Sequence, residues 1–84
     1  RKNYYKILIA EKPDYVIGDV FSLDLALPLY LRMHEKKLKN LKVIQKVQKH
    51  TPNWVKDFLN RDEFKGIAFM VDSIDELPEL IRAS

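Results

Sequence analysis

Two aspartates, five positions apart, mark the part of this chain whose residue types could carry chemistry. Asp19 follows the apolar run of residues 15–17 and Gly18, and Asp24 lies a short loop further on. Magnesium prefers oxygen ligands and usually takes one or two carboxylates from a protein. A loop that brings Asp19 and Asp24 together could therefore hold Mg²⁺. The alternative is that Asp19 only ends a strand and Asp24 only caps a helix.

The residues around the two aspartates predict the elements that position them. The unbroken apolar run of residues 15–17 is typical of a strand buried on both faces of a parallel sheet. Gly18 allows a sharp turn or the close approach of a neighbour. Pro28 has no N–H, so regular helix should begin at about residue 25 or later, with Asp24 at or just before its start. Asp19 then lies at the carboxyl ends of the strands, where open parallel sheets bind ligands.

The stretch from Tyr15 to Asp24 resembles the last motif of the haloacid dehalogenase (HAD) superfamily, which is written GDxxxD or GDxxxxD. This chain has the longer spacing, with Gly18-Asp19 followed by Asp24. The resemblance implies that both aspartates help to hold Mg²⁺. It also implies that Lys2, ahead of the helix leading into this strand, is the catalytic lysine of the preceding motif. The implied function is that of a cytoplasmic phosphatase acting on a small phosphorylated substrate.

The first motif of the superfamily, DxDx(T/V), supplies the nucleophile and the general acid/base, and no DxD occurs in the 84 residues. The resemblance therefore implies that residues 1–84 are the C-terminal part of a HAD-like core domain, without an internal domain boundary. Its partner would be the missing N-terminal part of the same enzyme. Arg1, rather than Met, at the first position agrees with this expectation. The 84 residues alone should be inactive.

Composition is that of a globular chain and argues against several other classes. The sequence is 46% hydrophobic and 32% charged, which does not fit a disordered segment. It has no cysteine, so it is not a secreted disulfide scaffold. No apolar run approaches the roughly 18 residues that a membrane helix requires, and we expect no membrane association.

Helical and strand patterns alternate along the whole chain. Tyr4, Ile7 and Leu8 form the apolar stripe of a first helix, and Val43, Ile44 and Val47 favour a strand over an extension of the preceding helix. The remaining expected elements are a helix over 25–38, a helix begun by Thr51 and Pro52, a strand over 67–71 and a closing helix after Ser73–Glu76, which matches a capping box.

This alternation predicts an α/β fold with a three-layer Rossmann-like parallel sheet and flanking helices, here a partial HAD-like core. The edge of the first strand would stay open unless another segment pairs with it, so the isolated chain could self-associate.

The lysines support a second function class. The basic stretch is interpreted as a solvated face, because aromatic residues do not interleave with it as in single-stranded nucleic-acid binders. Nucleic acid is therefore not an expected partner. The alternative to an enzyme is a noncatalytic α/β binding module whose basic face meets an acidic partner. His34 and His50 are expected at the surface, and Trp54 is expected to pack. The lysines of the stretch are Lys36, Lys37, Lys39, Lys42, Lys46 and Lys49.

Overall fold

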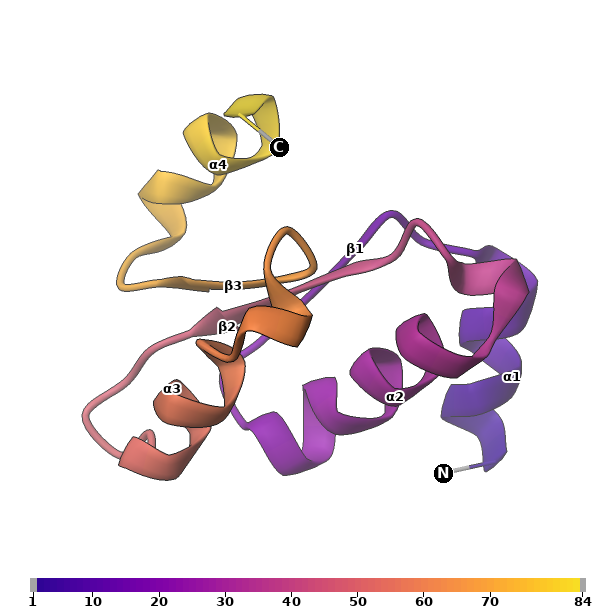
Figure 1. The fold of residues 1–84 in the computed structure, drawn as a ribbon, viewed down its shortest axis with the longest axis horizontal. Coiled ribbons are helices and arrows are strands. Elements are labelled where there is room, and N and C mark those ends of the chain that lie inside the picture. Colours follow the sequence, from indigo (N-terminus) through magenta and orange to yellow (C-terminus); the bar gives the residue numbers. More distant parts are fainter. Residues whose placement is uncertain (1, 84) are drawn as a thin grey trace.

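A three-stranded parallel sheet organises the chain. In a computed structural model, which describes residues 2–83, the strands are β1 (Tyr15–Gly18), β2 (Lys42–Lys46) and β3 (Ala68–Val71), in the order β1-β2-β3 (Figure 1). Ile17 pairs with Ile44, and Ile44 pairs with Phe69. The predicted α/β class is confirmed, as is the prediction that both apolar runs lie in one parallel sheet. The middle segment is a strand, as predicted.

Helices flank both faces of this sheet. They are α1 (Lys2–Glu11), α2 (Ala26–His34), α3 (Asn53–Leu59) and α4 (Leu77–Ala83). Both crossover helices, α2 and α3, lie on one face, and α4 lies on the other (Figure 1). The result is a small three-layer arrangement of the Rossmann-like kind.

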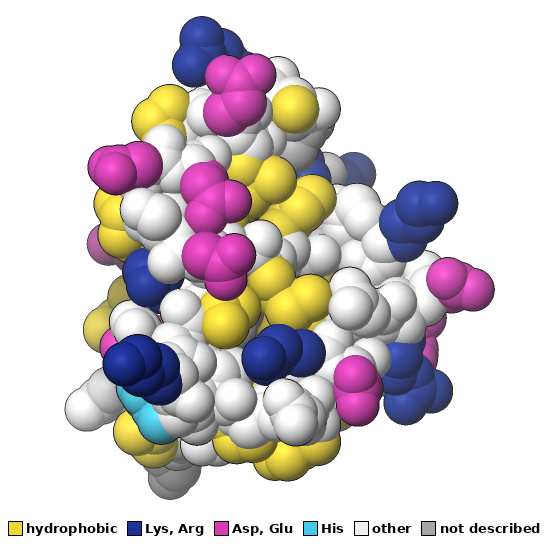
Figure 2. Space-filling view, turned by 90° about the vertical axis from the view of Figure 1, so that its left-hand side faces the viewer, with side chains coloured by type: hydrophobic (Ala, Val, Ile, Leu, Met, Phe, Trp, Pro, Cys, Tyr) yellow, Lys and Arg dark blue, Asp and Glu magenta, His cyan; other side chains and the backbone are white. Residues whose placement is uncertain are grey.

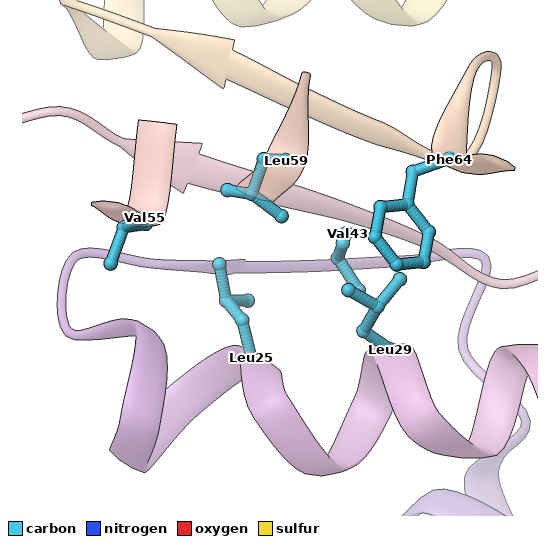
Figure 3. Close-up of a cluster of buried hydrophobic side chains, with 6 residues drawn as sticks. All are labelled: Leu25, Leu29, Val43, Val55, Leu59 and Phe64. Carbon is cyan, nitrogen blue, oxygen red and sulfur yellow. The ribbon is translucent and has the colours of Figure 1, made fainter. Parts of the chain in front are cut away.

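The main core lies between the sheet and the two crossover helices. Its buried members point toward one another from α2, α3, β2 and the flanking turns (Figure 3). A second cluster joins α1 to α2 through Leu8, Leu31, Leu38 and Leu41. Burying an aliphatic side chain of this size contributes about 1.5–3 kcal/mol, so these two clusters fix the positions of the helices. The members of the main core are Leu25, Leu29, Val43, Val55, Leu59 and Phe64.

The first strand is less buried than its sequence predicted. The Ile17 side chain is 42% exposed, because β1 is an edge strand and α4 packs over β3, where Phe69 and Leu80 line a common hollow. Ile7 of the predicted α1 stripe is also exposed, at 56%. The apolar pattern identified both elements correctly but did not show which of their faces would be covered.

The second helix begins as predicted but ends earlier. α2 starts at Ala26, so Asp24 lies just before it, and a π-helical turn over Phe21–Leu25, which the sequence did not predict, precedes the helix. At the other end the chain is extended at Glu35, and a separate 3₁₀ turn carries Leu38. This break lets Leu38 pack into the second cluster instead of continuing along the helix.

Two predicted caps had different outcomes. Thr51 is not the N-cap of α3: Pro52 holds that position, and the Thr51 hydroxyl accepts a hydrogen bond from the Gln48 N–H at 2.8 Å. The capping box at Ser73 is confirmed, because Ser73 Oγ accepts from the Asp75 N–H and Glu76 Oε2 accepts from the Ser73 N–H. It begins a 3₁₀ turn that leads into α4.

Candidate functional site

Asp19 lies directly after β1, at the carboxyl ends of the strands. Its side chain is exposed, while its main-chain carbonyl accepts a hydrogen bond from Gln45 Nε2 at 2.9 Å. The backbone is thus tied to the neighbouring strand, and the carboxylate remains open to solvent. This is the position that the sequence predicted for it.

Asp24 is held from two sides in the turn that precedes α2. Its Oδ2 accepts from the Val20 N–H at 3.1 Å, and its main-chain carbonyl accepts from the Tyr4 hydroxyl at 2.7 Å. Pro28, four residues on, has no N–H to donate to the Asp24 carbonyl. The Tyr4 hydroxyl supplies the missing donor. Asp24 therefore links α1 to the loop between β1 and α2, and its carboxylate closes that loop through the bond from the Val20 N–H.

Gly18 allows the Asp24 side chain to lie against the end of β1. A Cβ at position 18 would fall 2.4 Å from Asp24 Cβ and 2.8 Å from Asp24 Oδ2. The glycine is required by this close approach, because its φ is not in the left-handed region. Gly18, Asp19 and Asp24 consequently form one compact unit at the carboxyl end of β1.

Gln45 is a site residue that sequence reasoning missed. It is fully buried, and Nε2 donates to the carbonyls of both Asp19 and Lys46, at 2.9 and 3.1 Å. Both partners are carbonyl oxygens, so the amide nitrogen is the atom that faces them. The amide oxygen, Oε1, is buried without a partner among the described residues. The available signal was an amide two residues after Val43, in phase with the buried face of a strand.

A hollow of about 220 Å³ opens beside Asp19. Ser22, Gln45, His50 and Thr51 contribute polar groups to its lining, and Trp54 contributes an apolar wall. Figure 2 looks at the side of the molecule toward which the strands run, where hydrophobic side chains occupy the middle and charges of both signs surround them. The structure therefore brings residues from three separate segments to the edge that carries Asp19.

A larger apolar groove of about 460 Å³ lies next to this hollow, between α2 and α3. It shares Phe21 and Trp54 with the hollow, and these two rings meet edge to face with their centroids 5.8 Å apart. Trp54 packs against Phe21, as predicted for a packing residue, but it is 56% exposed and lines a surface. The groove is larger than the hollow, but the two aspartates that could hold a cation lie outside its lining.

Asp19 and Asp24 are the two carboxylates that a metal ion at this end of β1 could use. Within residues 2–83, no three acidic, histidine or cysteine side chains come together as a metal site. Asp19 offers an exposed carboxylate, whereas one oxygen of Asp24 is engaged with the Val20 N–H. Mg²⁺ typically keeps several waters and takes only one or two protein carboxylates, so an ion held by Asp19 and Asp24 would need further ligands. Lys2, the predicted catalytic lysine, has its side chain outside the described residues.

The lysines of the basic stretch do not form one continuous face. Lys36, Lys37 and Lys39 precede β2, whereas Lys46 ends the strand and Lys49 follows it. Lys46 Nζ donates to the Val47 carbonyl at 3.3 Å. The strand thus separates the lysines into two groups at opposite edges of the sheet, which weakens the case for a single basic binding face. His34 and His50 are exposed, as predicted.

Comparison with known proteins found no matching family model, no similar curated protein and no similar solved structure. In the part of the chain that the structure describes, no helix has both the length and the apolar character needed to span a membrane.

Proposed function

We propose that this chain is the C-terminal part of a cytoplasmic, magnesium-dependent phosphohydrolase of the HAD type. The observation that carries the proposal is the unit of Gly18, Asp19 and Asp24. Gly18 has no side chain, so Asp24, the second aspartate of a GDxxxxD motif, can lie against the end of β1, next to Asp19.

Three further features support the same function. Asp19 lies at the edge of a parallel sheet where ligands bind. Ser22 and Thr51 are among the residues that line the hollow beside it. The edge of β1 is not paired within the described residues, so another strand can be added next to Asp19.

In this proposal Asp19 provides an exposed carboxylate for the ion, and Asp24 fixes the loop through its bond to the Val20 N–H. Bound magnesium would supply positive charge against the phosphoryl oxygens of the substrate. Gln45 holds the Asp19 carbonyl, so it limits movement of the carboxylate. Neither aspartate serves as the nucleophile, which comes from the segment that pairs with β1.

The test compares residues 1–84 with the same chain extended upstream, using p-nitrophenyl phosphate and Mg²⁺. The proposal predicts no turnover by residues 1–84 and magnesium-dependent turnover by the extended chain. Asp19→Asn in the extended chain should remove most of that turnover while the fold is kept. Magnesium-dependent turnover by residues 1–84 alone, abolished by Asp19→Ala, would place the nucleophile inside this sequence and contradict the division of roles. An inactive extended chain would contradict the proposed function itself.

A further inference from the structure

A second polar hollow lies at the opposite edge of the sheet, near the amino ends of β1 and β2. It measures about 310 Å³ and is distinct from the hollow beside Asp19. Its lining consists of Asp14, Tyr15, Arg32, Lys39, Asn40 and Lys42, which we call the basic hollow. Because β2 runs from Lys42 to Lys46, the two edges are separated by about 13 Å along the strand.

Three cationic side chains meet in the basic hollow against one carboxylate. Arg32 comes from α2, Lys39 from the turn after it, and Lys42 from the first position of β2. The two ion pairs found among residues 2–83 are Arg61 with Glu63 and Arg82 with Glu79, so neither neutralises these three cations. Like charges gathered in one concavity raise the local concentration of anions.

The burial of Arg32 distinguishes this site from a group of surface lysines. Its side chain is half-buried, and its Nε is buried without a hydrogen-bond partner among the described residues. A buried donor left unpaired is costly, and for a charged group the cost is larger. An anion in the hollow would offset the positive charge of this half-buried guanidinium, whereas a water molecule would not.

The two lysines are also free of carboxylate partners in this part of the chain. Lys42 Nζ lies 5.8 Å from the centroid of the Tyr15 ring, which keeps the ammonium near the hollow without neutralising it. Lys39 is exposed. The Asn40 amide adds further N–H donors to the same lining.

We propose that the basic hollow binds the phosphate group of a small molecule, with Arg32, Lys39 and Lys42 as its ligands. A phosphate monoester carries close to two negative charges at pH 7, which suits three cations beside one carboxylate. The terminal nitrogens of the planar Arg32 guanidinium can donate hydrogen bonds to phosphate oxygens. A hollow of this size lies at the lower end of the range for small-molecule sites. This site does not depend on the proposed function, because it uses none of the residues near Asp19.

The test is a titration of the 84-residue chain with inorganic phosphate, glycerol phosphate and acetate, followed by amide chemical shifts. Both phosphates should give saturable shifts at residues 14–15 and 39–42, weakened by added NaCl, while acetate binds more weakly. Tighter binding of glycerol phosphate would identify a phosphorylated metabolite as the source, and tighter binding of inorganic phosphate would identify the free ion. Acetate binding as tight as phosphate would overturn the assignment to phosphate.

Variants separate the site from general charge. Arg32→Gln and Lys42→Gln should each weaken phosphate binding roughly tenfold or more, because each removes a charge-assisted hydrogen bond. Lys49→Gln removes the same charge at the other edge of the sheet and should leave the affinity unchanged within about twofold. If Arg32→Gln loses its folded spectrum, the double variant Lys39→Gln/Lys42→Gln carries the test. Shifts that do not saturate, or equal losses in Lys49→Gln and Lys42→Gln, would overturn the proposal.

Discussion

At the scale of single residues, Gly18 is a position that leaves no room for a side chain. An added Cβ would lie 2.4 Å from Asp24 Cβ, so the Asp24 turn and the end of β1 would have to separate. We expect Gly18→Ala to lower the free energy of unfolding by about 1–3 kcal/mol, the usual cost of overpacking. Chemical denaturation followed by circular dichroism measures this.

A double-mutant cycle shows whether the Asp24 contact is the cause. Asp24→Gly removes the opposing Cβ, so Gly18→Ala should cost less in that background than in the wild type. Equal costs in both backgrounds would mean that the strain lies elsewhere and that Gly18 is not explained by Asp24.

Gln45 makes a second prediction at this scale. Gln45→Met keeps a similar volume but leaves the carbonyls of Asp19 and Lys46 without the Nε2 donor. We expect a loss of about 1–3 kcal/mol of stability, and a larger loss for Gln45→Glu, which buries a charge. Faster amide exchange around residues 18–20 would locate the effect at the site. Stability equal to the wild type in Gln45→Met would show that the two hydrogen bonds contribute nothing.

At the scale of elements, the Tyr4 hydroxyl links α1 to the turn before α2. It donates to the Asp24 carbonyl at 2.7 Å, where Pro28 offers no N–H. Tyr4→Phe should therefore destabilise the chain by about 1–2 kcal/mol. Tyr5→Phe is the matched control, because Tyr5 lies on the same helix and is 42% exposed, and it should have almost no effect. Thermal unfolding of both variants would reveal the difference, and equal midpoints would contradict this role for Tyr4.

The sequence predicted most elements because their patterns are local. The runs Tyr15–Ile17 and Ile67–Val71, and the capping box at Ser73, depend on neighbouring residues alone. The rule for Pro28 predicted the start of the second helix correctly, but it could not predict the π turn over Phe21–Leu25 or the donor that Tyr4 supplies there. That contact joins residues 20 positions apart, which no local pattern contains.

The candidate site was predicted only in part for the same reason. Gly18, Asp19 and Asp24 lie within one short stretch, so their proximity follows from the sequence. Gln45 on β2 bonds to Asp19 at the end of the neighbouring strand β1, and this contact depends on the register that pairs Gly18 with Gln45. The exposure of Ile17 likewise depends on where α4 packs.

At the scale of the whole molecule, different features lie at the carboxyl ends and at the amino ends of the strands, which we call the carboxyl edge and the amino edge. The carboxyl edge has the two aspartates and the Gln45 bond to Asp19, and the amino edge has the basic hollow. β1 has no neighbour on its outer side among the described residues. The proposed enzyme would add the strand with its nucleophile on that side, next to Asp19.

Mn²⁺ titration of the ¹⁵N-labelled chain tests most directly whether Asp19 and Asp24 form part of a magnesium site. Mn²⁺ substitutes for Mg²⁺ on oxygen ligands and broadens nearby amide signals. We predict selective broadening at residues 18–24, reversed by excess Mg²⁺ and lost in Asp19→Asn, while Asp57→Asn, which removes an exposed carboxylate from α3, leaves it unchanged. Broadening that is spread over all acidic residues, or that Asp19→Asn leaves unchanged, would contradict a magnesium site at Asp19 and Asp24.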